Sequence, residues 1–109
     1  MSLPAQFYQL KENLFNDLKV QIEKDFYLCG IPTISNNLNP EEYYSKLKST
    51  ITQLHLDDYQ TLKNMLYRVD IKEVDIESIS IKFQLNIEES ITVAILNRSL
   101  QKIELKKKV

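Results

Sequence analysis

Leu38-Asn39-Pro40-Glu41-Glu42-Tyr43 is the stretch that decides the fold, because it has the features of a helix start. Asparagine is a preferred N-cap, proline suits the first helical position, and a glutamate three residues after the cap completes a capping box. Leu38 is placed to pack on Tyr43 as a hydrophobic staple. The sequence therefore predicts a helix from Pro40, whose apolar stripe is Tyr43, Tyr44, Leu47, Ile51 and Leu54.

A further helix is expected directly after this one. Asp57 can act as its N-cap, and Gln60 stands in the capping-box position. Its apolar side consists of Tyr59, Leu62, Met65, Leu66 and Val69. The connection between the two helices is short, so we expect them to run antiparallel.

Upstream of this pair, residues 5–28 predict one long amphipathic helix. Its apolar residues recur at three- and four-residue steps: Phe7, Leu10, Leu14, Phe15, Leu18, Ile22 and Phe26. Gly30 predicts the end of this helix, because glycine is the usual residue just past a helix C-terminus. Residues 31–38 contain proline, serine and asparagines that favour turns, so they predict a loop.

The C-terminal segment predicts a last helix from Ile87 to about Leu105, capped by Asn86 together with Glu89. This helix is apolar on two sides. Ile87, Ile91 and Ile95 lie on one side, and Val93, Leu96, Leu100 and Ile103 lie nearly opposite. Such a helix is either central in a bundle, or packs on its own core with one side and on a partner with the other.

Residues 70–85 fit two structures. Ile79, Ile81, Phe83, Leu85 and Ile87 alternate with polar residues as in a half-buried strand. The same stretch fits a helix through Ile76, Ile79, Phe83 and Ile87, with Asp75 as its cap. A strand needs a partner for its backbone groups, and the sequence offers no second strand. We therefore predict a short helix there.

The fold class that follows is all-α. We expect residues 1–109 to form a single domain, a compact bundle of four to five helices with a long first helix and a central last helix. Composition agrees, because 43% apolar and 27% charged residues are typical of a globular domain. One glycine and three prolines are few for a sheet protein, whose strands need many turn residues.

Composition also limits the partners and the compartment. A net charge of −1, with twelve lysines but only two arginines, disfavours nucleic acid and anionic membranes as partners. No apolar run approaches the roughly 18 to 20 residues that cross a bilayer. Cys29 is the sole cysteine, and the N-terminus lacks the pattern of a signal peptide. These features predict a cytoplasmic protein.

The sequence offers little catalytic chemistry. A metal site needs several ligands, and His55 is the single histidine; its neighbours Asp57 and Asp58 have sufficient roles at a helix start. Cys29 precedes a helix-ending glycine, where a thiol is not activated. One glycine cannot build a phosphate-binding loop. We therefore expect no metal, no cofactor and no enzymatic activity.

Charged residues within apolar stripes must be paired or reach water. Asp25 interrupts the first helix, and Arg98 stands among the isoleucines of the last helix. One hypothesis is that Asp25, or another carboxylate, pairs with Arg98 or Arg68 and fixes the helix register. The alternative is that each charge extends to water at the rim of the bundle, as long cationic side chains do readily.

A partner surface is the most informative functional hypothesis. Tyr67 lies off its helix stripe and is the best candidate for an exposed tyrosine. Together with the second side of the last helix it defines the expected interface: Tyr67, Val93, Leu96, Leu100 and Ile103. The sequence thus predicts a non-enzymatic protein–protein interaction module that forms a homodimer. It also allows binding to a different protein, whose identity the sequence does not indicate.

The alternative function is a nucleic-acid-associated regulator, in which the helices of residues 40–69 act as a helix-turn-helix. Its weakness is that residues 57–69 contain only Lys63 and Arg68 as cations, which is few for a recognition helix.

Two short strings carry a family resemblance. Leu66-Tyr67-Arg68-Val69-Asp70-Ile71 and the stretch Ile95-Leu96-Asn97-Arg98-Ser99-Leu100-Gln101-Lys102 resemble a group of short, uncharacterised helical proteins from Bacteroidota. The resemblance covers roughly the C-terminal half of the chain and contains no chemical motif. It implies an all-helical fold and no particular activity.

Overall fold

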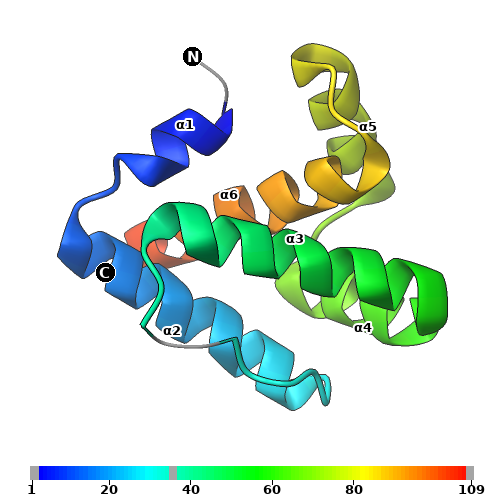
Figure 1. Cartoon of the computed structure of the whole chain (residues 1–109), viewed down its shortest axis with the longest axis horizontal. Helices are drawn as coiled ribbons and strands as arrows, with labels where there is room; N and C mark the ends of the chain where they lie inside the picture. The colour runs from blue at the N-terminus through cyan, green and yellow to red at the C-terminus, as the bar shows by residue number, and fades with distance from the viewer. Residues whose placement is uncertain (1–2, 35–36, 108–109) are drawn as a thin grey trace.

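Six α-helices make up the part of the chain that the structure, a computed structural model, describes: residues 3–34 and 37–107 (Figure 1). They are α1 (Leu3–Tyr8), α2 (Glu12–Leu28), α3 (Pro40–Asp57), α4 (Tyr59–Val69), α5 (Glu73–Phe83) and α6 (Ile87–Lys107). The predicted all-α class is confirmed. The expected four to five helices become six because the first predicted helix is divided.

The division of the first helix corrects the prediction for residues 5–28. The chain leaves the helix after Tyr8 and begins α2 at Glu12. This break lets Phe7 fold back on Phe15, with the ring centroids 5.9 Å apart. In one continuous helix these two residues would be about 12 Å apart along the axis. The intervening residues include no proline or glycine, so the packing of Phe7 explains the break better than local sequence does.

The predicted start of α3 is confirmed. The backbone N–H of Glu42 donates to Asn39 Oδ1 at 2.9 Å, and the backbone N–H of Asn39 donates to Glu42 Oε1 at 3.0 Å. This reciprocal pair is a complete capping box. Asn86 caps α6 as expected, since its Oδ1 accepts from the backbone N–H of Glu89 at 2.8 Å.

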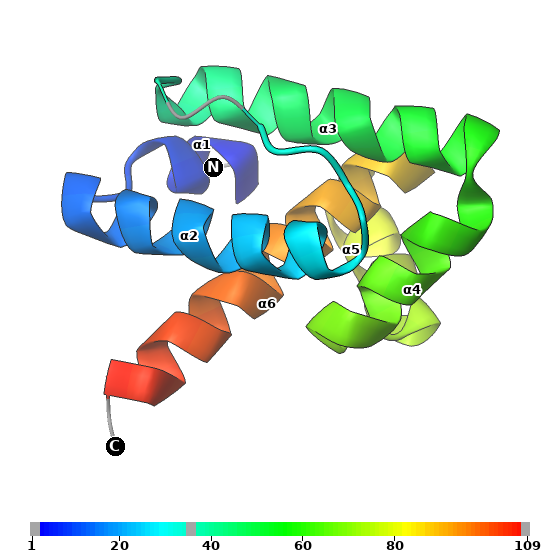
Figure 2. The same cartoon turned by 90° about the horizontal axis from the view of Figure 1, so that it is seen from below.

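Two other predicted N-caps are wrong, because each helix is capped at a different residue from the one predicted. Asp57 is the last residue of α3, and Asp58 caps α4 by accepting from the backbone N–H of Thr61 at 3.2 Å. Because Asp57 still belongs to α3, Asp58 is the single residue that connects α3 to α4. Asp75 lies inside α5, where it accepts from the backbone N–H of Lys72 at 3.2 Å. Helix α4 turns back from the end of α3 (Figure 2).

Left-handed residues end three helices. Gly30 has φ +75° and follows α2 as predicted, and the next residue, Ile31, donates to the carbonyl of Phe26 at 2.9 Å. Asp70 after α4 and Gln84 after α5 also have positive φ, of 69° and 54°. These two ends are not marked by glycine in the sequence.

Residues 79–83 are helical, which confirms the choice of helix over strand. They belong to α5, which buries Ile76 and leaves Ile81 exposed. The chain turns at Gln84 before α6 begins. Helix α5 therefore packs on the bundle through a narrow face.

Helix α6 is central, as the sequence predicted. It packs against α2, α3, α4 and α5, and in Figure 2 it crosses α2 before emerging toward the C-terminus. Every residue from 90 to 96 is buried. Val93, Leu96 and Ile103 are thus core residues and Leu100 is half-buried. The expectation that they form a partner surface is wrong, because other helices of the same chain cover them.

The helices form one compact body. The radius of gyration is 13.1 Å, which matches the roughly 13 Å expected for a compact domain of this length. None of the helices in the described ranges has both the length and the apolar content required to cross a bilayer.

Candidate functional site

An apolar groove of about 570 Å³ opens between α4 and α5. We call it the α4–α5 groove. Its buried lining is Leu62, Ile76 and Ile91, from α4, α5 and α6 respectively. Leu66, Ile71, Ile81 and Ile87 extend the apolar surface, and His55 closes the end nearest α3. The lining is mostly hydrocarbon, which is typical of binding sites in proteins.

The groove exists because α4 and α5 diverge. Residues 70–72 join them, yet α5 packs mainly on α6, and in Figure 1 it runs across the direction of α4. Asp70 sits in this turn in the left-handed conformation. Its Oδ2 lies 3.1 Å from a terminal nitrogen of Arg98 on α6. This ion pair ties the turn to the central helix and so supports the angle at which α5 leaves α4.

Large apolar side chains remain exposed around the groove. Tyr67 is 88% exposed and Ile81 is 73% exposed, from opposite walls. Tyr59 and Ile87 are also about half exposed at the same groove. Single exposed apolar residues are ordinary, but a group of them around an apolar hollow is typical of an interaction site. Of the residues predicted for the interface, only Tyr67 lies on this surface.

Three charged side chains lie at the groove: Lys63 on α4, and Glu73 and Glu77 on α5. All three are exposed. The ion pairs found among the described residues join other groups. Lys63 approaches the ring of Tyr59 at 5.9 Å. The two walls of the groove thus have opposite charge.

His55 lies between the end of α3 and the start of α6. Its Nδ1 lies 3.4 Å from Glu88 Oε1, and its ring packs edge-on against Tyr59 with centroids 5.7 Å apart. The neighbouring Asp57 accepts from Gln53, and Asp58 serves the α4 cap. Within residues 3–34 and 37–107, no group of three or more histidines, cysteines and carboxylates is arranged to hold a metal.

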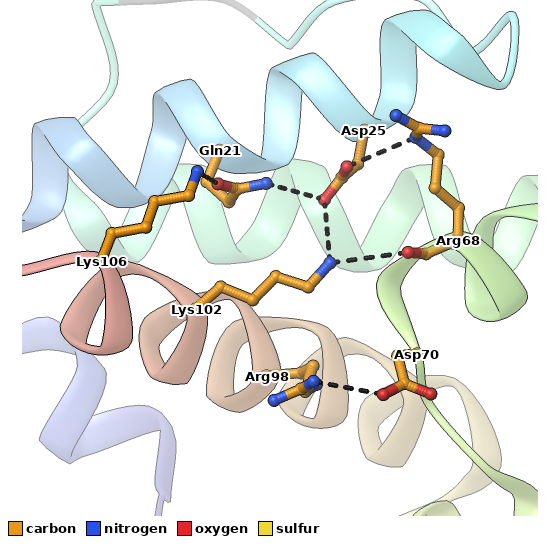
Figure 3. Close-up of polar contacts among 7 residues, drawn as sticks. All are labelled: Gln21, Asp25, Arg68, Asp70, Arg98, Lys102 and Lys106. Atoms are coloured by element: carbon orange, nitrogen blue, oxygen red, sulfur yellow. Dashed lines mark hydrogen bonds and ion pairs between the residues drawn. The ribbon is translucent and has the colours of Figure 1, made fainter. Parts of the chain in front are cut away.

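A second polar feature is buried between α2, α4 and α6 (Figure 3). Asp25 on α2 is only 4% exposed. Its Oδ1 lies 3.5 Å from Nε of Arg68, and its Oδ2 lies 3.7 Å from Nζ of Lys102. Gln21 donates to Oδ2 at 3.2 Å and accepts from Lys106 at 2.9 Å. One carboxylate therefore holds side chains from three helices.

Of the predicted ion-pair residues, the structure brings Asp25 and Arg68 together and places Arg98 elsewhere, with Asp70. Sequence reasoning missed Lys102, Lys106 and Gln21. Their spacing was visible, since Lys102 and Lys106, like Gln21 and Asp25, are four residues apart on one helix face. What the sequence could not show is that these two faces meet.

Cys29 is not activated by its surroundings. Burial raises the pKa of its thiol, and this effect exceeds the opposite influence of Arg68. Cys29 lies close enough to Asp25 and Arg68 to feel their charges, whereas His55 contacts Glu88 and Tyr59. These contacts do not suggest a cysteine–histidine pair.

No protein family, curated protein or solved structure matches the chain. The resemblance to helical proteins from Bacteroidota therefore stays a prediction.

Proposed function

We propose that this protein is a non-enzymatic protein–protein interaction module, that it works as a homodimer, and that the α4–α5 groove is its interface. The observation that carries the proposal is the group of exposed apolar residues at an apolar groove, with Tyr67 and Ile81 on opposite walls. The interface predicted from the sequence included the second side of α6. That side is in the core, so the proposal moves to α4 and α5 while Tyr67 remains part of it.

A protein partner fits this surface better than a small ligand does. Small-molecule sites enclose most of the ligand and direct a few polar groups into the pocket. Here the charged groups Lys63, Glu73 and Glu77 are exposed at the groove, and the apolar surface continues onto exposed Tyr67 and Ile81. An apolar centre with a polar rim is the usual anatomy of a protein–protein interface.

The alternative, a nucleic-acid-associated regulator, has less support. The typical turn between the helices of a helix-turn-helix has three to four residues, whereas Asp58 alone separates α3 from α4. Arg68, one of the two cations on α4, pairs with the buried Asp25. Lys63 is then the single free cation on this helix, which is too little for binding to phosphates.

The test compares two matched substitutions on exposed β-branched residues. Ile81→Asp places a charge in the proposed interface, and Val20→Asp, at a residue 70% exposed on α2, is the control. Light scattering at micromolar concentration should show a dimer for the wild type and for Val20→Asp, and a monomer for Ile81→Asp. Circular dichroism should show the same helicity for all three. Equal masses for the two variants would contradict the proposed interface.

A further inference from the structure

The charges of the α4–α5 groove lie at comparable distances from the turn that joins its walls. Lys63 precedes the end of α4 by six residues, or about 9 Å of helix, and Glu77 follows the start of α5 by four residues, or about 6 Å. Glu73 lies one helical turn before Glu77 and nearer the turn. Lys63 on α4 and Glu77 on α5 thus both lie partway along the groove.

Two ways of placing a second copy on the groove have different electrostatic consequences. A two-fold axis that runs along the groove places α4 of each copy on α5 of the other, so the cation faces the acids. A two-fold axis across the groove places α4 on α4 and α5 on α5, so Lys63 faces Lys63 and Glu77 faces Glu77. Like charges placed together at an interface are costly, so the first arrangement is favoured.

We infer that two copies associate about a two-fold axis along the groove, with Lys63 of each copy paired to Glu77 of the other. This inference rests on the proposed homodimer and adds its geometry and the residues that specify it. Neither Lys63 nor Glu77 has an ion-pair partner among residues 3–34 and 37–107, and this supports the inference, because a second copy would supply the opposite charge. In an interface about a two-fold axis, each such ion pair occurs twice, once in each direction between the two copies.

A partner helix with charge of a single sign would satisfy fewer of these charges. A basic amphipathic helix would complement Glu73 and Glu77 but would place its cations beside Lys63. An acidic helix would complement Lys63 and oppose both glutamates. A second copy of this chain complements both walls at once, which is why it is the occupant we infer.

The experiment reverses the charges singly and then together. Lys63→Glu and Glu77→Lys each create two like-charge contacts in their own dimer, so each should weaken the dimer on the order of tenfold or more. An equimolar mixture of the two variants should form a heterodimer in which every contact is again between opposite charges. The double variant Lys63→Glu/Glu77→Lys should dimerise as the wild type does. Lys24→Glu and Glu104→Lys, exposed on α2 and α6, are the controls.

The outcomes separate the inference from the function on which it rests. Analytical ultracentrifugation across a dilution series gives the dissociation constant of each protein and of the mixture. If the wild type dimerises and Ile81→Asp disrupts it, but the charge reversals leave the dissociation constant unchanged, the inferred axis is wrong and the interface stands. Weakening by single reversals without rescue in the mixture also overturns the pairing. A wild type that is monomeric overturns both.

Discussion

Asp25 Oδ1 lies 3.5 Å from Arg68 Nε, a contact that joins the buried face of α2 to the last turn of α4. The second oxygen of the same carboxylate faces Lys102 on α6. The carboxylate is almost entirely buried, whereas the Arg68 side chain is 42% exposed. Without its cations the Asp25 carboxylate would be a buried, uncompensated charge, which is costly. Arg68 and Lys102 are more exposed, so water can compensate either of them if the carboxylate is lost.

This asymmetry predicts unequal effects of substitution. Asp25→Asn should lower the free energy of unfolding by about 2 kcal/mol, because two ion pairs are lost and the hydrogen bond from Gln21 no longer has a charged acceptor. Arg68→Met should lower it by about 1 kcal/mol, since Lys102 still faces the carboxylate. Urea unfolding of the two single variants and the double variant forms a double-mutant cycle. Strictly additive effects would show that the two residues are not coupled.

Glu23 gives the fold a defined pH dependence. It accepts hydrogen bonds from the hydroxyl of Tyr43 at 3.0 Å and from the backbone N–H of Ile34 at 3.2 Å. Burial nevertheless raises the pKa of Glu23 above its ordinary 4.5, because it outweighs the lowering effect of those hydrogen bonds. The folded state then binds more protons than the unfolded state, and stability falls as pH rises from 4.5 through the folded pKa.

We therefore expect Glu23→Gln, which keeps a hydrogen-bond acceptor and removes the charge, to gain stability relative to the wild type as pH rises from 4 to 7. Thermal unfolding of both proteins at the two pH values measures this difference. Glu104→Gln, at an exposed position of α6, is the control. A free energy of unfolding of Glu23→Gln that falls relative to that of the wild type as pH rises would contradict the assignment.

The left-handed helix ends predict two opposite glycine effects. Gly30→Ala should destabilise the protein by about 1 kcal/mol, because a side chain at φ +75° is strained even though nothing lies within 4 Å of the added Cβ. Gln84→Gly should stabilise it by roughly 0.5 kcal/mol, since Gln84 is exposed and already adopts φ 54°. Chemical denaturation measures both, and the same sign for the two variants would refute this explanation.

Two exposed tyrosines distinguish the proposed interface from the rest of the surface. Tyr67 is 88% exposed at the groove, and Tyr27 is 79% exposed on α2. Tyr67→Ala should weaken the dimer on the order of tenfold or more, because tyrosines at the centre of an interface are frequent hot spots. Tyr27→Ala should leave the dissociation constant unchanged. Equal effects of the two substitutions would exclude a specific role for Tyr67.

The local parts of the fold could be predicted, because their causes lie within a few residues. Asn39 with Glu42, Asn86, and Gly30 each mark a helix end by chemistry that acts over one turn. The break after Tyr8 could not be found in this way, since it depends on Phe7 reaching Phe15 in the folded chain.

The candidate site was predictable only in part. The two apolar sides of α6 indicated a central helix or a partner surface, and hydrophobic periodicity cannot distinguish the two. The structure decides this for Val93 and Leu96, which lie in the core. The exposure of Tyr67 followed from its place off the stripe of α4. The groove beside it depends on the angle between α4 and α5, which the sequence does not encode locally.

Dimerisation of the wild-type chain is tested by its solution mass, measured by light scattering across a dilution series from high to low micromolar concentration. We expect a mass near twice the 12.8 kDa of one chain at the highest concentrations, falling toward one chain on dilution. A mass of one chain at every concentration would contradict it, because the α4–α5 groove would then have no second copy to bind.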